Sequence, residues 1–245
     1  MLFALEVLLL STALVDVVVT AVTVAIATAV SLLFLPDRST FLVPSLHGRP
    51  VLLLGALAVG PIAGVVAAAF TKLTGAARNS AARGWRLIPG CVAAFAGLAV
   101  LGIFRPEVLG NGKGPAQLAL TGSLALPVAA ALLLLKPIAT AVCLRGGAVG
   151  GMLMPAFATG SLAGLLVGHA WAHLVTGTQP GAFAVLGGGA VLAGTMRAPL
   201  TALALGIELT GVGPGLALPL AIAVGGSFLT CRTIIKRLNK REAQE

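Results

Sequence analysis

Charged side chains are scarce in this sequence. Aspartate, glutamate, lysine and arginine together account for 9% of the 245 residues, whereas an ordinary soluble domain carries about 25%. Mean hydropathy is +1.05, and 58% of the residues are hydrophobic. Long apolar stretches with so few charges exclude an ordinary soluble domain and indicate an integral membrane protein. The apolar runs are continuous rather than alternating, which favours membrane helices over a β-barrel.

Metal-ligating residues are also few. The three cysteines, Cys91, Cys143 and Cys231, are scattered among apolar residues without metal-ligand spacing, which favours packing thiols. His169 and His173 stand four residues apart on one predicted helix face, but no carboxylate is near them in the sequence. Interfacial positions at a helix end therefore explain the two histidines better than a metal site does. We predict no metal and no cofactor.

The basic residues fall in two blocks, and the formal net charge is +9. The first block lies within residues 72–86. The second block consists of Arg232, Lys236, Arg237, Lys240 and Arg241. Basic blocks beside apolar spans indicate the cytoplasmic side, so we predict a transmembrane domain over 1–231 and a basic cytoplasmic tail over 232–245. So short a tail beside a span is expected to meet lipid headgroups rather than nucleic acid.

The first half of the chain predicts continuous membrane spans. Residues 1–10 read as the end of a helix, and the predicted spans cover 12–35, 51–73 and 87–104. Gly60 and Gly64 lie four residues apart in the second span, a spacing that lets another helix approach closely.

Glycine and proline interrupt the second half. Its apolar pieces, at 116–135, 137–144, 182–193 and 199–211, are broken or shorter than the roughly 20 residues needed to cross a bilayer. We predict a break at Lys136-Pro137. Broken helices inside a membrane are tolerated only where they line a cavity or are buried in protein, which is typical of transport proteins.

The segment 145–171 is the most informative part of the sequence. Glycine occupies four of the six positions from 146 to 151, and each would cost a helix interior about 1 kcal/mol relative to alanine. Pro155 follows where the first turn of a helix tolerates proline. The segment predicts an extended arm that leads into the N-terminus of a buried helix, whose free N–H groups and dipole suit an anion. A glycine-rich turn between two ordinary spans is the alternative.

Three polar residues in apolar surroundings are further candidates. Ser161 lies in no Gly-x-Ser-x-Gly motif, which disfavours an intramembrane hydrolase, and we predict that the protein is not an enzyme. Glu208 lies in an apolar helix, where a charge is costly and often functional. Pairing of Glu208 with Arg197 or with a backbone N–H is the structural alternative. Arg197 precedes a predicted helix, so we expect it at the aqueous rim or paired with an acid.

Several of these segments resemble the chloride channel and transporter (CLC) family. Gly-Gly-Met-Leu-Met-Pro at 150–155 is similar to the family's Gly-x-Phe-x-Pro filter motif, with Leu153 at the usual Phe position. Residues 192–210 resemble a second signature, an Arg-Ala-Pro-Leu-Thr segment running to Glu-x-Thr. Residues 108–112 resemble a third motif, and Phe3-Ala-Leu-Glu6 resembles the end of a family helix that closes on a glutamate.

The resemblance implies an all-α integral membrane fold, a polytopic bundle of tilted and broken helices in the bacterial inner membrane. It also implies a homodimer with one anion pathway in each subunit. Backbone amides at helix N-termini, here Met152 and Leu153, would hold the dehydrated halide. The anion-binding candidates are Gly150, Gly151, Met152, Leu153, Met154 and Pro155; the candidate functional charges are Glu6, Arg197 and Glu208. Backbone donors attract an anion without a full cationic charge that would trap it.

The sequence also departs from the family pattern. The first-half elements Gly-Ser-Gly-x-Pro and Gly-Arg-Glu-Gly-Pro are absent, and so is the tyrosine that helps to line the family's site. We interpret the chain as the C-terminal portion of a CLC-type protein without its N-terminal helices, and a missing N-terminal half is a possible partner. Alone, the chain is expected to bind halide weakly and conduct little. Chloride efflux from liposomes, with and without a co-expressed N-terminal piece, tests this expectation.

Val7 bears on the transport mechanism. Proton-coupled family members usually carry an acid at the position after Glu6, and valine cannot carry a proton. We therefore predict passive anion conduction. A proton-coupled chloride antiporter and a non-conducting fragment are the alternatives.

Overall fold

The computed structural model describes residues 6, 13–34, 39–44, 46, 51–242 and 244. All regular structure in these residues is helical, in agreement with the predicted all-α fold. The longer helices are α1 (Leu14–Phe34), α2 (Val51–Asn79), α3 (Leu87–Phe104), α4 (Lys113–Thr121), α5 (Leu126–Arg145), α6 (Leu153–Leu174), α7 (Pro180–Met196), α8 (Pro199–Thr210) and α9 (Ala217–Glu242). Short 3-10 turns precede α3, α4 and α9 at η2 (Gly84–Arg86), η3 (Pro106–Val108) and η4 (Pro214–Leu216).

Six of the described helices are long and apolar enough to cross a membrane: α1, α2, α3 with η2, α5, α6 and α9 with η4. The predicted spans of the first half are confirmed, and α3 has the predicted bounds. In the second half, α7 and α8 are short as expected, whereas α5 is long enough to cross a membrane. The prediction of separate pieces at 116–135 and 137–144 is therefore wrong for α5. Helices α6 and α9 are also long enough to cross.

The expected break at Lys136-Pro137 does not occur, since α5 runs through both residues. Proline removes one N–H from the helix, yet its fixed φ suits a helix, and neighbouring helices in a membrane protein can compensate for the lost bond. Here α5 packs against both α2 and α6. In α9 the basic tail continues the last span as one helix.

Glycine brings α6 and α7 into backbone contact at the centre of the molecule. A Cβ on Gly160 would lie 2.3 Å from the Gly187 carbonyl oxygen, and one on Gly164 would lie 2.1 Å from that of Phe183. Nearly all of α7 is buried, because α2, α6, α8 and α9 all pack against it. The two close approaches fix how deeply α6, and with it the N-terminus of α6, sits in the fold.

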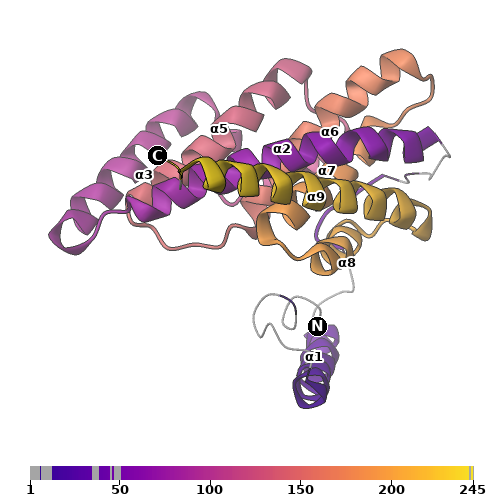
Figure 1. The fold of residues 1–245 in the computed structure, drawn as a ribbon, viewed down its shortest axis with the longest axis horizontal. Coiled ribbons are helices and arrows are strands. Elements are labelled where there is room, and N and C mark those ends of the chain that lie inside the picture. The colour runs from indigo at the N-terminus through magenta and orange to yellow at the C-terminus, as the bar shows by residue number, and fades with distance from the viewer. Residues whose placement is uncertain are drawn as a thin grey trace.

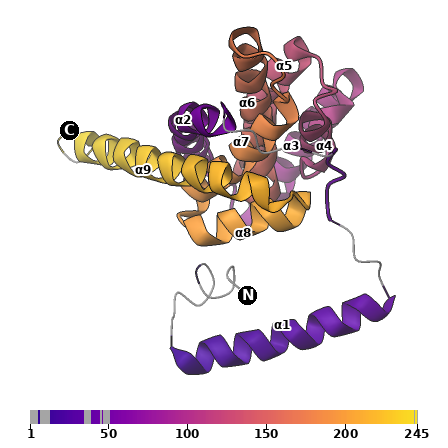
Figure 2. The same ribbon diagram turned by 90° about the vertical axis from the view of Figure 1, so that its right-hand side faces the viewer.

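A second glycine contact joins α2 to α9, which lie side by side along the molecule (Figure 1). A Cβ on Gly60 would lie 3.1 Å from the Ala223 carbonyl oxygen, and one on Gly64 would lie 2.6 Å from Thr230 Cβ. The close approach predicted from the spacing of Gly60 and Gly64 is thus confirmed. By contrast, α1 is almost entirely exposed and lies apart from the packed helices (Figure 2).

Candidate functional site

The glycine arm that precedes α6 is anchored at its first residues. The Ala82 N–H donates to the Arg145 carbonyl oxygen at 2.9 Å, and a Cβ on Gly146 would lie 2.8 Å from the Gly90 carbonyl oxygen. Gly147 has φ +99°, a conformation that side chains rarely adopt. Residues 148–151 then form no regular structure. The predicted extended arm is therefore present, and it ends at the start of α6.

The N-terminus of α6 has unused hydrogen-bond donors. Helix α6 begins at Leu153, Met152 occupies the N-cap position, and no side chain caps the helix. Ala156 N–H is the first amide to be satisfied, by the Met152 carbonyl oxygen at 3.0 Å. The amides of Met152, Leu153 and Met154 have no hydrogen-bond partner among the described residues. Pro155, buried in the first turn, has no N–H to leave unsatisfied.

A cavity of ≈ 190 Å³ lies against this helix end. The arm contributes Gly150, Gly151 and Met152 to its wall, and the 108–112 segment contributes Asn111. The remaining lining residues are Leu98, Val108, Gly110, Lys136, Ala139, Thr140, Cys143, Leu144, Ala148, Val149 and Pro155. Two segments that resemble family motifs, 108–112 and 150–155, therefore share one cavity.

Lys136 is the cation in this wall, and sequence reasoning missed it. Its side chain is only 3% exposed. The ammonium group donates to the Val108 carbonyl oxygen at 2.7 Å and to that of Gly110 at 2.6 Å. A lysine ammonium has three N–H donors, so these bonds leave one. The available signal was a lone lysine inside an apolar run, which in a membrane helix indicates a functional residue more often than a break.

Glu6 lies elsewhere, at the N-terminus of α8. Its Oε2 accepts a hydrogen bond from the Thr201 N–H at 2.6 Å. Thr201 is the third residue of α8, where a carboxylate is stabilised by the free amides and by the helix dipole. The Glu6 carboxylate therefore accepts a hydrogen bond from a free amide at the N-terminus of α8. The N-terminus of α6 has no such side-chain acceptor among the described residues.

Arg197 and Glu208 are not brought together. Arg197 precedes α8 and Glu208 lies near its other end, so about 16 Å of helix separates them. Both residues are exposed, which excludes the buried pair considered from the sequence. The exposure of Arg197 is compatible with the other position expected for it, at the aqueous rim.

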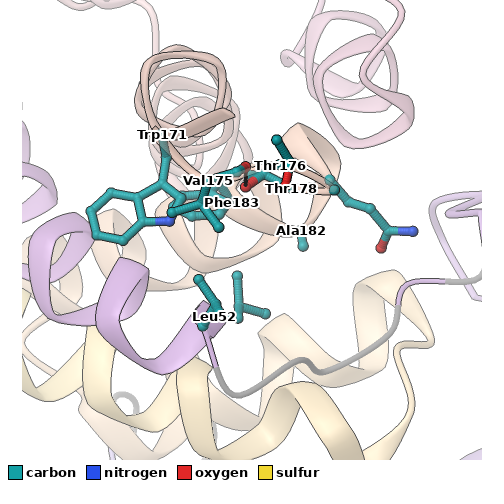
Figure 3. A pocket seen from close by; sticks show the side chains of 10 residues that line it. Leu52, Trp171, Val175, Thr176, Thr178, Ala182 and Phe183 are labelled. Atoms are coloured by element: carbon teal, nitrogen blue, oxygen red, sulfur yellow. Dashed lines mark hydrogen bonds between the residues drawn. The ribbon is translucent and has the colours of Figure 1, made fainter. Parts of the chain in front are cut away.

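The opposite end of α6 has a cavity of only ≈ 50 Å³ (Figure 3). The Trp171 ring packs against Phe183 with a centroid separation of 6.1 Å, and its buried Nε1 has no hydrogen-bond partner among the described residues. This volume has room for a few water molecules. Nearby, His169 Nδ1 lies 3.0 Å from the Leu165 carbonyl oxygen. No group of three His, Cys, Asp or Glu residues within the described part of the chain could hold a metal ion.

Comparison with known proteins identifies the family. The family model described as "Voltage gated chloride channel" matches residues 1–232. The chain belongs to this CLC family. The H⁺/Cl⁻ exchange transporter ClcA of Cronobacter sakazakii is 30% identical over 90% of this chain and 52% of its own length. The protein of the same name from Klebsiella pneumoniae subsp. pneumoniae is 32% identical over 66% of this chain and 36% of its own length.

Solved CLC structures share the fold. A slow cyanobacterial Cl⁻/H⁺ antiporter superposes with a TM-score of 0.73 at 20% identity, over 80% of this chain and 48% of that one. A CLC-type fluoride/proton antiporter gives a TM-score of 0.64 at 22% identity, over 84% and 50%. The chain spans about half the length of the first of these curated relatives and of both structures.

These comparisons change which transport mechanism is favoured. The cited curated relatives are named as proton/chloride exchangers, which favours the proton-coupled alternative over passive conduction. Val7, on which the prediction of passive conduction depends, lies outside the described residues. The neutral side chain of Val7 is therefore weaker evidence on the transport mechanism than the names of the relatives.

Proposed function

We propose that this CLC protein takes part in anion transport across a membrane, and that the anion binds in the cavity at the N-terminus of α6. The observation that carries the proposal is the uncapped start of α6. The amides of Met152, Leu153 and Met154 have no partner among the described residues, and Met152 lines a cavity whose wall also includes the buried Lys136. A helix N-terminus attracts a small anion through its N–H groups and dipole. Gly150, Gly151 and Pro155 complete the candidate site without adding side-chain charge.

We further infer that transport is proton-coupled chloride exchange, because the relatives carry that activity in their names. The proposal retains the homodimer with one pathway in each subunit, the bacterial inner membrane, and a cytoplasmic C-terminus. Arg232 and the following basic residues of α9 support this orientation through the positive-inside rule.

Replacing the amide of Leu153 by an ester tests the binding site. Incorporation of the α-hydroxy analogue of leucine substitutes oxygen for one N–H and leaves the side chain unchanged. A hydrogen bond to a charged group contributes about 1.5–3 kcal/mol, so we expect chloride affinity to fall about tenfold to about hundredfold. Isothermal titration of the detergent-solubilised protein measures the dissociation constant.

The matched control is an ester at Ala156. Its N–H is already used by the Met152 carbonyl oxygen, so its loss weakens the helix slightly but removes no anion donor. We expect near-unchanged chloride affinity there. Equal losses at Leu153 and Ala156, or no loss at Leu153, would contradict the assignment of the site.

Proton coupling needs a separate measurement. Proteoliposomes loaded with chloride and diluted into low chloride should take up protons as chloride leaves, and a protonophore should release the gradient. The ratio of protons to chloride should stay fixed when the chloride gradient is varied. Chloride efflux with no proton movement would restore the passive mechanism while leaving the binding site intact.

A further inference from the structure

A second cavity, of ≈ 260 Å³, lies between the end of α7 and the C-terminal half of α9. Three of its lining residues are cationic: Arg197, Arg232 and Lys236. The others are Gly194, Phe228, Cys231, Ile235 and Asn239, and none of these described lining residues is acidic. The cavity approaches the lower end of the range for small-molecule sites, about 300 Å³.

The cations come from two separate elements. Arg232 and Lys236 are one helical turn apart, so they lie on the same face of α9. Arg197 ends α7 with φ +56°, and it is the one non-glycine residue with positive φ in the described part of the chain. That conformation costs about 1–2 kcal/mol, and strained backbone of this kind tends to occur at functional positions. Like charges gathered around one hollow repel each other unless an anion is bound.

The position along α9 indicates what carries the anion. Pro214–Arg241 is a candidate membrane span, and its basic residues begin at Arg232. The cavity therefore lies where apolar sequence gives way to charge, which corresponds to the headgroup level of a bilayer. Phe228 and Ile235 supply apolar wall beside the cations. An anion attached to an apolar chain fits both kinds of lining residue.

We propose that the cavity formed by Arg197, Arg232 and Lys236 binds the phosphate group of an anionic membrane lipid. The three cations contact the phosphate, while Phe228 and Ile235 lie against the glycerol and the first part of the acyl chain. This site is distinct from the cavity at the N-terminus of α6, with which it shares no lining residue.

Short-chain phosphatidylglycerol is the probe, titrated against the detergent-solubilised chain by isothermal titration. Each basic residue near an anionic lipid contributes an affinity factor of about five. We expect the double variant Arg232→Gln with Lys236→Gln to lose about 25-fold in affinity. Arg197→Gly should lose about fivefold, and because glycine accepts positive φ this variant should unfold at or above the wild-type temperature.

The matched control is the double variant Arg237→Gln with Lys240→Gln. It removes the same charge from the same exposed end of α9 but from residues that do not line the cavity. We expect the affinity for the lipid to fall less than threefold in this variant, because charges outside the cavity attract the phosphate only through the general positive potential of the helix end. Equal losses in the two double variants would overturn the site. Equal affinity for short-chain phosphatidylcholine would overturn the requirement for an anionic lipid, and inorganic phosphate binding as tightly as the lipid would reassign the cavity to free phosphate.

Discussion

Lys136→Met should lower chloride affinity about tenfold or more. Lys136 is the buried cation of the cavity at the N-terminus of α6, and a hydrogen bond to a charged partner contributes about 1.5–3 kcal/mol. Methionine has similar length, so the space remains filled while the charge and all three donors are lost. Isothermal titration with chloride measures the change in dissociation constant.

The same substitution should also destabilise the 108–112 segment. Val108 and Gly110 lose the ammonium that holds their carbonyl oxygens. A buried acceptor left without a partner costs about 1–3 kcal/mol, and the Val108 carbonyl is the buried one of the two. Hydrogen exchange of the amides in 108–116 should therefore accelerate, and the unfolding temperature in detergent should fall by several degrees.

Lys113→Met is the matched control, because Lys113 is exposed and directly follows the 108–112 segment as the first residue of α4. Removing this exposed charge should change neither chloride affinity nor stability measurably. A folded Lys136→Met protein with wild-type chloride affinity would show that Lys136 only holds the 108–112 segment, and the amides of α6 would then be the sole ion ligands.

Gly164→Ala should destabilise the protein by about 3 kcal/mol or more. The added methyl group would lie 2.1 Å from the Phe183 carbonyl oxygen, 2.8 Å from the Phe183 carbonyl carbon and 3.0 Å from Ala184 Cα. All three are backbone atoms of α7, so no side-chain rotation can make room and the helices must separate. Thermal unfolding in detergent measures the loss. Chloride affinity should fall as well, because α6 carries the candidate site.

Gly97→Ala provides the comparison for Gly164→Ala. Gly97 lies in α3, and a Cβ there would meet nothing within 4 Å. Alanine in such a helix position should stabilise by up to about 1 kcal/mol. If both variants unfold at the wild-type temperature, the close packing of α6 on α7 is not what holds the core together.

Much of the fold could be predicted from local sequence. The bounds of α3 follow from polar residues at both ends of a continuous apolar run, and the start of α6 follows from the glycines and Pro155. The prediction for α5 is wrong because Pro137 reads as a break, while the packing that lets the helix continue comes from distant segments. Local patterns specify breaks well only when no tertiary contact compensates for them.

The candidate site was only partly predictable. The uncapped start of α6 could be derived from residues 146–155 alone. Only the structure places residues 108–112 beside it, because no local pattern relates the two segments. Lys136 is visible in the sequence, but beside Pro137 it reads as part of a break. The contact of Glu6 with Thr201 joins residues 195 positions apart, a separation at which single-sequence patterns carry no information.

The N-termini of α6 and α8 differ in the source of the negative charge that they bind. At α8 the Glu6 carboxylate of the same chain provides it, whereas the first amides of α6 have no partner among the described residues and, in our proposal, bind a diffusible anion. A tethered carboxylate has a very high local concentration and would outcompete any free halide. Because the Glu6 carboxylate occupies the N-terminus of α8, only the N-terminus of α6 is left, of these two, to bind a transported anion.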